Sequence, residues 1–312
     1  MSVLSNTGIR AGASAASGGD SVKYVEEVFN THLYAGVDSP SAITVDNGID
    51  LENEGGMVWF ARRSDAQWHS MFDTERGTEK VLYSDQTSAE GTNTGSLTAF
   101  NDNGFTIGTH VYINDDDGSG NPTAHVAWTF RKAPGFFDVV KYEGTGSAQA
   151  IAHNLGCKPG CILVKNIDDS TNWEVYHRKS DVDYTGTAPE DYKLELNNNV
   201  ARDDNENVWN DTAPTSTHFT VGVNNSTDTK NYIAYLFADG DESDAQIFGD
   251  DGDESIIKMG TLNRYNSRRK IAQKKSEDYI YSLSKKESEK LQEILKNEEK
   301  YIDELNNYLA KE

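Results

Sequence analysis

The chain has 312 residues, which is long enough for two domains with substantial hydrophobic cores. Its 51 Asp and Glu residues outnumber its 29 Lys and Arg residues, and the resulting formal charge of −22 repels nucleic acid and anionic membrane surfaces. No apolar stretch approaches the roughly 18 residues that a membrane-spanning helix needs, so we expect neither nucleic acid nor a membrane among the partners.

The first segment, residues 1–22, is rich in Ser, Gly and Ala. Such a composition buries too little apolar surface to offset its own ordering entropy, so it predicts a flexible arm that becomes ordered only against a partner. Its opening residues, Met1 to Leu4, lack the basic start and apolar core of a secretory signal. We therefore expect the chain to be synthesised in a cytoplasm and to stay soluble.

From the arm to about residue 250, the apolar residues come in short runs separated by clusters of Gly, Asn, Asp and Ser. The runs are rich in Val, Ile, Tyr, Phe and Trp, which is typical of β-strands, and no stretch has a sustained helical period. The predicted strands are 58–60, 105–107, 125–130, 139–142, 162–164, 173–176, 193–196, 219–223 and 232–237. The sequence therefore predicts a mainly β fold.

This β region contains the same pattern twice. The recurring positions are Phe29, Tyr34, Gly36 and Ile43 with Phe137, Tyr142, Gly144 and Ile151, Gly56 and Trp68 with Gly160 and Trp173, Phe105–Gly108 with Phe219–Gly222, and Val126–Phe130 with Ile233–Phe237. Because the recurring residues are mainly apolar and turn positions, we expect a duplicated framework. We predict two tandem antiparallel β-sandwich units, residues 23–138 and 139–262. Residues 255–261 imitate 138–144, and we expect them to form a strand borrowed by the second unit.

The last segment, residues 263–312, changes in composition. The 36 residues after Ser276 contain neither Pro nor Gly and are dense in helix-forming residues, so they predict a helix up to about 54 Å long. A narrow apolar stripe runs along it, formed by Leu291, Leu295, Ile302, Leu305 and Leu309. Three roles fit such a stripe: packing on the chain's own β unit, self-association as a trimer or dimer, and docking on another protein.

Local catalytic motifs are missing from the sequence. Its seven histidines form no recognised metal or nucleophile spacing, and Cys157 and Cys161 cannot assemble a four-ligand zinc site by themselves. We predict no enzyme activity, no catalytic residue and no cofactor. A carboxylate pair for glycoside cleavage could still be brought together across strands, because such a pair is defined by its separation in space.

Two loops are crowded with carboxylates, residues 115–118 and residues 248–254. Oxygen-rich turns of this kind bind Ca²⁺ in some proteins, but neither loop has the twelve-residue EF-hand pattern, so an ordinary acidic turn is the alternative. The metal content is therefore left open.

The aromatic residues divide into two groups. Trp59, Trp68, Trp128, Trp173 and Tyr235 occupy repeat-equivalent positions, which predicts that they lie in the core, with stacking against a sugar as the alternative. Trp209 lies outside the shared pattern, and we predict that it forms an exposed contact.

Several phrases of the sequence resemble an uncharacterised repeat domain of tail-fibre and other virion proteins of tailed bacteriophages, especially marine and cyanobacterial ones. The phrases are residues 55–60, 72–77, 126–137, 176–178, 232–238 and 248–252, together with the opening residues 4–14. The resemblance covers residues 1 to about 262. It implies a structural or receptor-contacting part of a virion and carries no catalytic residues.

The hypothesis from the sequence is thus a virion structural protein, similar to a tail fibre or another surface component, made in the host cytoplasm. Its arm and terminal helix would contact other virion proteins, and the helix would assemble a homo-oligomer. The first alternative is a carbohydrate-binding adhesin that contacts a host-surface glycan through residues 114–122 and Trp209. The second is a glycan-degrading spike enzyme.

Overall fold

The computed structural model describes residues 24–37, 41–115, 122–180, 188–241, 243–260, 296–297 and 299–300. The chain divides into two compact units, residues 1–259 and 260–312, close to the predicted change of character at residue 263. Residues 296–297 and 299–300 are helical, whereas the arm and the rest of the predicted helix lie outside the described residues. All strands of the described part of the chain lie in the larger unit.

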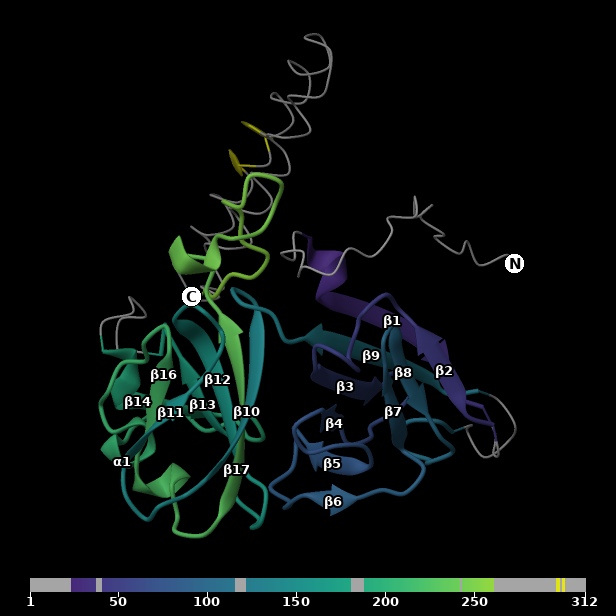
Figure 1. Ribbon diagram of the computed structural model, residues 1–312, viewed down its shortest axis with the longest axis horizontal. Coiled ribbons are helices and arrows are strands. Elements are labelled where there is room, and N and C mark those ends of the chain that lie inside the picture. The colour runs from purple at the N-terminus through teal and green to yellow at the C-terminus, as the bar shows by residue number, and fades with distance from the viewer. Residues whose placement is uncertain are drawn as a thin grey trace. The chain divides into compact units, whose positions relative to one another are not determined.

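The first repeat contains two antiparallel sheets, one of six strands in the order β1-β9-β3-β4-β5-β6 and one of three strands in the order β2-β8-β7 (Figure 1). The six strands are β1 (Phe29–Ala35), β9 (Ala124–Arg131), β3 (Gly56–Arg62), β4 (Ser70–Asp73), β5 (Lys80–Tyr83) and β6 (Gly91–Thr92). The three are β2 (Ile43–Asp46), β8 (Gly104–Ile107) and β7 (Leu97–Asn101).

The second repeat has a six-stranded sheet in the order β10-β17-β12-β13-β14-β15 and a two-stranded sheet, β11-β16. Its strands are β10 (Phe137–Glu143), β17 (Asn231–Ala238), β12 (Pro159–Asn166), β13 (Glu174–His177), β14 (Tyr192–Glu195), β15 (Asp203–Asp204), β11 (Gln149–Ala152) and β16 (His218–Val221). Among the described residues of the larger unit, the helices are α1 (Glu206–Trp209) and the single turns η1 (Val25–Glu27), η2 (Pro189–Asp191), η3 (Val223–Asn225) and η4 (Ser243–Ala245). The fold is mainly β with antiparallel sheets, as predicted.

The large sheets of the two repeats share one strand order, and their registers agree at equivalent residues. Phe29 of β1 lies opposite Phe130 of β9, and Phe137 of β10 lies opposite Phe237 of β17. Because β10 begins at Phe137, the second sheet starts slightly before the predicted boundary at residue 138. In each repeat the first and last strands are therefore neighbours, which Figure 1 shows for β10 and β17.

Three hydrophobic clusters organise the larger unit. The first, around Val58, Phe60 and Phe105, fills the space between the large and small sheets of the first repeat. The second, around Ile162 and Phe219, does the same in the second repeat and also includes side chains of α1. The third cluster joins the two large sheets to each other. Side chains alternate between the two faces of a strand, so each large sheet is apolar on both faces.

The tyrosine that recurs in the two repeats ties β1 or β10 to a loop. Tyr34 donates its hydroxyl to the carbonyl oxygen of Ile113 at 2.6 Å, and Tyr142 donates to that of Asn225 at 2.9 Å. Each phenol is thus hydrogen-bonded while its ring packs in the core, which is the favourable arrangement for a buried tyrosine. The recurrence of this residue is explained by the same contact made twice.

The glycine two residues later recurs because the backbone comes close to the same loop. A Cβ atom on Gly36 would overlap the carbonyl oxygen of Asp115, and one on Gly144 would overlap that of Thr227. Since the obstacle is backbone in both cases, a side chain could be accommodated only by moving the loop. The Tyr-x-Gly pattern is therefore a device for holding one loop against the end of a strand.

The predicted strand over residues 255–261 is not formed in its described part, residues 255–260. This segment still contacts the second repeat: Gly240 donates its N–H to the carbonyl oxygen of Ile257 at 2.9 Å, and the side chains of Ile257 and Met259 pack on the core. The segment therefore packs on the second repeat, as expected, but it does not form the expected strand.

No helix among the described residues has the length and apolar character needed to cross a bilayer.

A buried histidine at the start of β9 makes the first repeat sensitive to pH. Thr123 Oγ1 donates to the carbonyl oxygen of Asp115 at 2.6 Å, so its 2.7 Å contact with His125 Nε2 must use a proton of the imidazole. His125 Nδ1 is then a buried acceptor with no hydrogen-bond partner among the described residues. Burial and the nearby charge of Arg62 lower the pKa of His125 to about 4, against the opposing charge of Asp65.

We predict that the free energy of unfolding decreases as the pH falls from about 6.5 to about 4. The unfolded imidazole binds a proton in this range and the folded one does not, so the pKa difference limits the loss to about 3 kcal/mol. Urea unfolding at several pH values would measure it. His125→Gln keeps a donor for Thr123 and should flatten this dependence; an unchanged slope in that variant would contradict the assignment to His125.

Candidate functional site

The two repeats meet through equivalent faces of their large sheets. The first repeat contributes Met57, Met71 and Leu82, all fully buried, and the second contributes residues of β10, β12, β13 and β17. The buried residues of this cluster on the second side include Phe137, Val139, Leu163, Trp173, Val175, Ile233, Tyr235 and Phe237. We call this contact the junction. It is the largest feature that the sequence analysis did not predict, and it is where the most unusual polar groups lie.

The junction contains a buried ion pair between Asp73 and Arg76. Asp73 is the last residue of β4, and a turn follows in which Arg76 donates its backbone N–H to Asp73 Oδ1 at 2.9 Å. The Arg76 Nε atom donates to Asp73 Oδ2 at 2.5 Å, and both side chains are 0% exposed. Removing two charges from water is costly unless every donor finds a partner.

Arg76 meets that requirement at all five of its N–H groups. In addition to the bond from Nε, Nη1 donates to the carbonyl oxygen of Lys80 at 3.0 Å and lies 3.4 Å from Glu90 Oε2. Nη2 donates to the carbonyl oxygen of Met71 at 3.0 Å and to the hydroxyl of Tyr235 at 3.2 Å. A guanidinium has five donors, so this one is fully satisfied.

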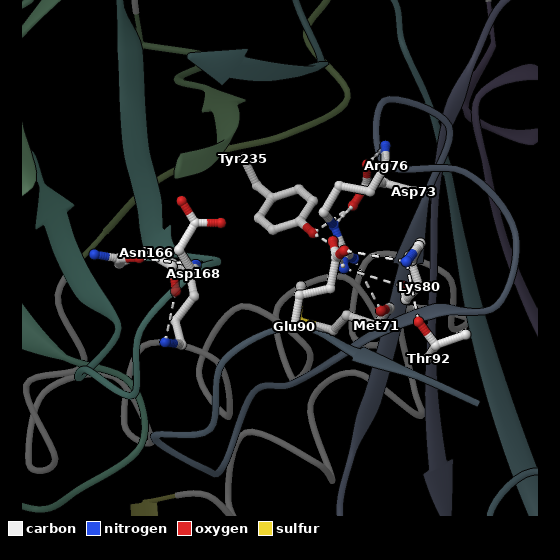
Figure 2. Close-up of polar contacts among 10 residues, drawn as sticks. Met71, Asp73, Arg76, Lys80, Glu90, Thr92, Asn166, Asp168 and Tyr235 are labelled. Atoms are coloured by element: carbon white, nitrogen blue, oxygen red, sulfur yellow. Dashed lines mark hydrogen bonds and ion pairs between the residues drawn. The ribbon is translucent and has the colours of Figure 1, made fainter. Parts of the chain in front are cut away.

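Tyr235 is the one member of this group from the second repeat. It projects from β17 toward Asp73 and Arg76, as Figure 2 shows, and its hydroxyl donates to Asp73 Oδ2 at 2.7 Å. The hydroxyl of Tyr235 therefore accepts a hydrogen bond from Arg76 and donates one to Asp73. The phenol closes a polar ring whose other members belong to the first repeat, 159 to 162 residues earlier in the chain.

The pKa shifts of Arg76 and Tyr235 fix the charge states of these two side chains. Burial alone would lower the pKa of Arg76. The charge of Asp73 and the neighbouring acceptors outweigh burial, so the pKa lies above its usual value. Burial also raises the pKa of the Tyr235 phenol well above its usual value, and the charge of Asp73 acts in the same direction. Arg76 therefore stays charged and Tyr235 stays protonated at any physiological pH.

Two further hydrogen bonds cross the junction. Trp173 donates its indole N–H to the carbonyl oxygen of Tyr83 at 2.9 Å, and Glu90 donates its backbone N–H to the carbonyl oxygen of Ile167 at 2.9 Å. The Trp173 ring also stacks near that of Tyr235, with centroids 6.1 Å apart. Directed bonds at several points hold the two large sheets in one orientation, beyond what the non-directional burial of apolar surface would fix.

The prediction for Trp209 is wrong. It is the last residue of α1 and is 2% exposed, and its ring packs edge-on against Tyr176 at 6.0 Å. Asn205 caps the N-terminus of this short helix, because its side chain accepts a hydrogen bond from the backbone N–H of Asn207. Trp209 fills the core of the second repeat because α1 packs its buried side chains, Val208 and Trp209, against that core.

The core prediction for the five repeat-equivalent aromatics holds only in part. Trp173 and Tyr235 are fully buried, as expected. Trp59 and Trp128 are half-buried and pack edge-on against each other, with centroids 6.0 Å apart. Trp68 is 44% exposed, so the junction buries the tryptophan of the second repeat while the corresponding one of the first repeat faces solvent.

Trp68 belongs to a group of aromatic rings at the surface of the first repeat. Its centroid lies 5.0 Å from that of Tyr83 and 5.8 Å from that of Tyr112, and His110 packs against Tyr112 at 5.1 Å. Asn93 donates to the hydroxyl of Tyr83 at 2.8 Å. We call these four rings the aromatic cluster. It combines an exposed ring face with nearby polar groups.

The acidic loops give no metal site among the described residues, where no group of three or more potential ligands is close enough to hold an ion. Asp115 Oδ2 lies 3.4 Å from Arg62 Nη1, and residues 116–118 lie outside the described part. In the second loop, Asp250 accepts a hydrogen bond from the hydroxyl of Tyr24 at 2.7 Å.

One pair of carboxylates is brought together across strands, but a lysine lies between them. Glu174 and Glu195 face each other on β13 and β14, and Lys193 Nζ lies 3.2 Å from Glu174 and 2.7 Å from Glu195. Burial raises the pKa of Glu174 against the charge of Lys193. For Glu195, burial is outweighed by hydrogen bonds from Lys193 and Asn198, so its pKa is lowered. The arrangement is a compact ion triad.

Cys157 and Cys161 are both reduced and form no disulfide. Cys157 is buried and Cys161 is half-buried, and burial raises the pKa of the Cys161 thiol to about 12. A protonated thiol is a poor nucleophile and a poor metal ligand.

Comparison with known protein families identifies a family for this chain. A family model described as a domain of unknown function, DUF7483, matches residues 25–242. The chain belongs to this family. No curated protein matches, and no solved structure matches. The DUF7483 segment starts at η1 and extends past β17, so it contains every strand of the two repeats and every junction residue named above.

We predict that Tyr235→Phe lowers the free energy of unfolding by about 1–3 kcal/mol. The change keeps the ring but leaves one N–H of Arg76 and one lone pair of Asp73 without a partner in a dry site. Urea unfolding of the two proteins measures the difference. As a control, Tyr112→Phe alters a half-buried phenol outside the junction and should change stability by less than about 0.5 kcal/mol. Equal effects of the two substitutions would contradict a special role for the Tyr235 hydroxyl.

Proposed function

We propose that the chain is a bacteriophage virion structural protein, similar to a tail fibre or another surface component, whose work is particle assembly and display. The observation that carries this proposal is the junction. A buried ion pair completed by a phenol from the other repeat, within an extensive apolar contact, favours a fixed spacing between the two repeats. A rigid module of this kind suits a part that positions other surfaces.

The proposal includes a finer description of the chain. We infer two tandem β-sandwich units, a flexible arm at residues 1–22 and a helical segment at residues 263–312. The matching strand orders of the two repeats support the tandem units, and the helical residues 296–297 and 299–300 agree with the helical segment. The arm and the helix would bind other virion proteins, and the helix would assemble a dimer or trimer.

Support for a virion comes from the sequence phrases that resemble phage fibre repeats. Three of them form parts of the junction or its surroundings: residues 72–77 contain the ion pair, residues 232–238 contain Tyr235, and residues 126–137 connect the two large sheets. Three of the phrases that resemble virion proteins therefore coincide with parts of the chain that fix the repeats to each other.

Mass spectrometry of purified particles of the phage that encodes the chain tests this function. We expect peptides of the chain at a fixed ratio to the major structural proteins after density-gradient purification. Recovery only in the soluble fraction of the lysate would contradict the proposal. Sedimentation of the chain with and without residues 271–312 tests the role of the helix, and an unchanged mass after truncation would exclude self-association through it.

The aromatic cluster favours a second candidate function, a carbohydrate-binding adhesin that contacts a host-surface glycan. An exposed tryptophan ring beside polar groups is suited to stack on the apolar face of a sugar. The exposed ring is that of Trp68, so this candidate now depends on the first repeat and no longer on Trp209.

A glycan array distinguishes the two functions. An adhesin should bind a defined set of glycans, and Trp68→Ala should reduce that binding at least tenfold. Val200→Ala, which changes a residue that is 57% exposed in the second repeat, should leave it intact. Absence of binding would remove the adhesin, whereas release of oligosaccharide from host polysaccharide would favour the glycan-degrading spike enzyme.

A further inference from the structure

The two six-stranded sheets have four edge strands, and three of them are protected. β6 and β15 contain only two residues each, too few to pair with another strand over any length. β10 is seven residues long, but it carries Asp138, Lys141 and Glu143, and its N-terminal half is buried. Short edges and charged edges are the usual devices by which sheets avoid pairing with other chains.

The fourth edge, β1, has neither device. Its seven residues, Phe29–Ala35, include no Asp, Glu, Lys, Arg or Pro. Among the described residues its only strand neighbour is β9, and the pairing runs through all seven positions without a bulge. On its other side, the strand therefore has a regular row of backbone donors and acceptors that pair with no strand of the described part of the chain.

The contrast with β10 is sharpest at equivalent positions. Leu33 corresponds to Lys141, and Ala35 corresponds to Glu143, with the same offset as the recurring Phe, Tyr and Gly residues. All four side chains are exposed, and Leu33 is 58% exposed, the largest value among the exposed large hydrophobic residues. The duplicated framework thus carries charges on one edge and apolar side chains on the other.

The two titratable side chains of β1, those of His32 and Tyr34, do not change this picture. Burial raises the pKa of the Tyr34 phenol, which therefore stays neutral. Burial lowers the pKa of His32, so its imidazole is uncharged at neutral pH. The exposed side chains on the opposite face of the strand are those of Thr31, Leu33 and Ala35. A partner strand would therefore meet no charge on β1 itself.

We propose that β1 pairs antiparallel with β1 of a second copy of this chain and so forms an interface between the two copies. Pairing of a strand with its own copy across a two-fold axis is self-complementary, because the two edges have the same length and the same lack of charge. Among the long edges of the two large sheets, β10 is charged and partly buried, so β1 itself is the matching strand that the described fold offers. The large sheet of the first repeat in one copy would then be continuous with the same sheet in the other copy.

The net charge gives this interface a distinctive salt dependence. Two copies with a formal charge of −22 each repel one another, while the strands that pair carry no charge. Screening by salt weakens the repulsion and leaves backbone hydrogen bonds and apolar contact unchanged. Association through β1 should therefore become stronger as the salt concentration increases, the reverse of an interface held by ion pairs.

The proposal is independent of the helical segment and of the virion function, so its test must report on β1 directly. Sedimentation equilibrium of the full chain over a range of concentrations gives the mass. Hydrogen exchange at the same concentrations gives the protection of the β1 amides. We expect the protection of β1 to increase with concentration together with the mass, and more so at high salt.

Leu33→Lys is the decisive variant, because it installs the residue that the second repeat already carries at the equivalent exposed position. It should weaken association at least tenfold and abolish the concentration-dependent protection of β1, although it reduces the net negative charge. Val200→Lys adds the same charge at an equally exposed residue in the second repeat and should behave as the wild type. Exchange in β1 that is independent of concentration, or equal association of the two variants, would overturn the proposal.

Discussion

The fold depends on the need of one buried guanidinium for five acceptors. The first repeat supplies four partners to Arg76, and the fifth is the hydroxyl of Tyr235 from the second repeat. An ion pair without that hydroxyl would leave a donor and an acceptor unsatisfied in a site that excludes water. The apolar faces could associate in several orientations, but the ring of Asp73, Arg76 and Tyr235 closes in only one. The polar group thus selects the geometry of an interface whose stability comes mainly from burial.

Duplication explains the framework, and divergence explains the sites. Both repeats keep a Tyr-x-Gly device that holds a loop against a strand end, and both keep an apolar face on each side of the large sheet. The ion pair occurs in the first repeat only, and its tyrosine partner replaces the tryptophan found at the equivalent position, Trp128. Once two copies packed face to face, equivalent residues were no longer in equivalent surroundings. Trp68 and Trp173 illustrate the result, since one faces solvent and the other is enclosed.

Periodicity and turn residues were sufficient to predict the mainly β fold, because runs such as 232–237 are apolar over their full length. Strands in which apolar and polar residues alternate, such as β1, and very short strands, such as β6, give a much weaker signal and were not predicted. The Asp73–Arg76 pair is visible in the sequence only as two charges three residues apart, a common spacing in turns. Its partner lies about 160 residues away, and nothing local to Tyr235 indicates that contact. The burial of Trp209 depends in the same way on where α1 packs, which nothing near Trp209 in the sequence indicates.

The adjacency of the first and last strands in each repeat has a mechanical and an evolutionary consequence. Because Phe29 lies opposite Phe130, and Phe137 opposite Phe237, the polypeptide enters and leaves each copy at the same end. A module with such neighbouring entry and exit points can be inserted into a longer chain, or multiplied within it, without stretching its surroundings. With the same geometry, tension applied to the two ends of a module would separate its first and last strands by breaking their backbone hydrogen bonds one pair at a time. Resistance to force would then have to come from contacts between modules.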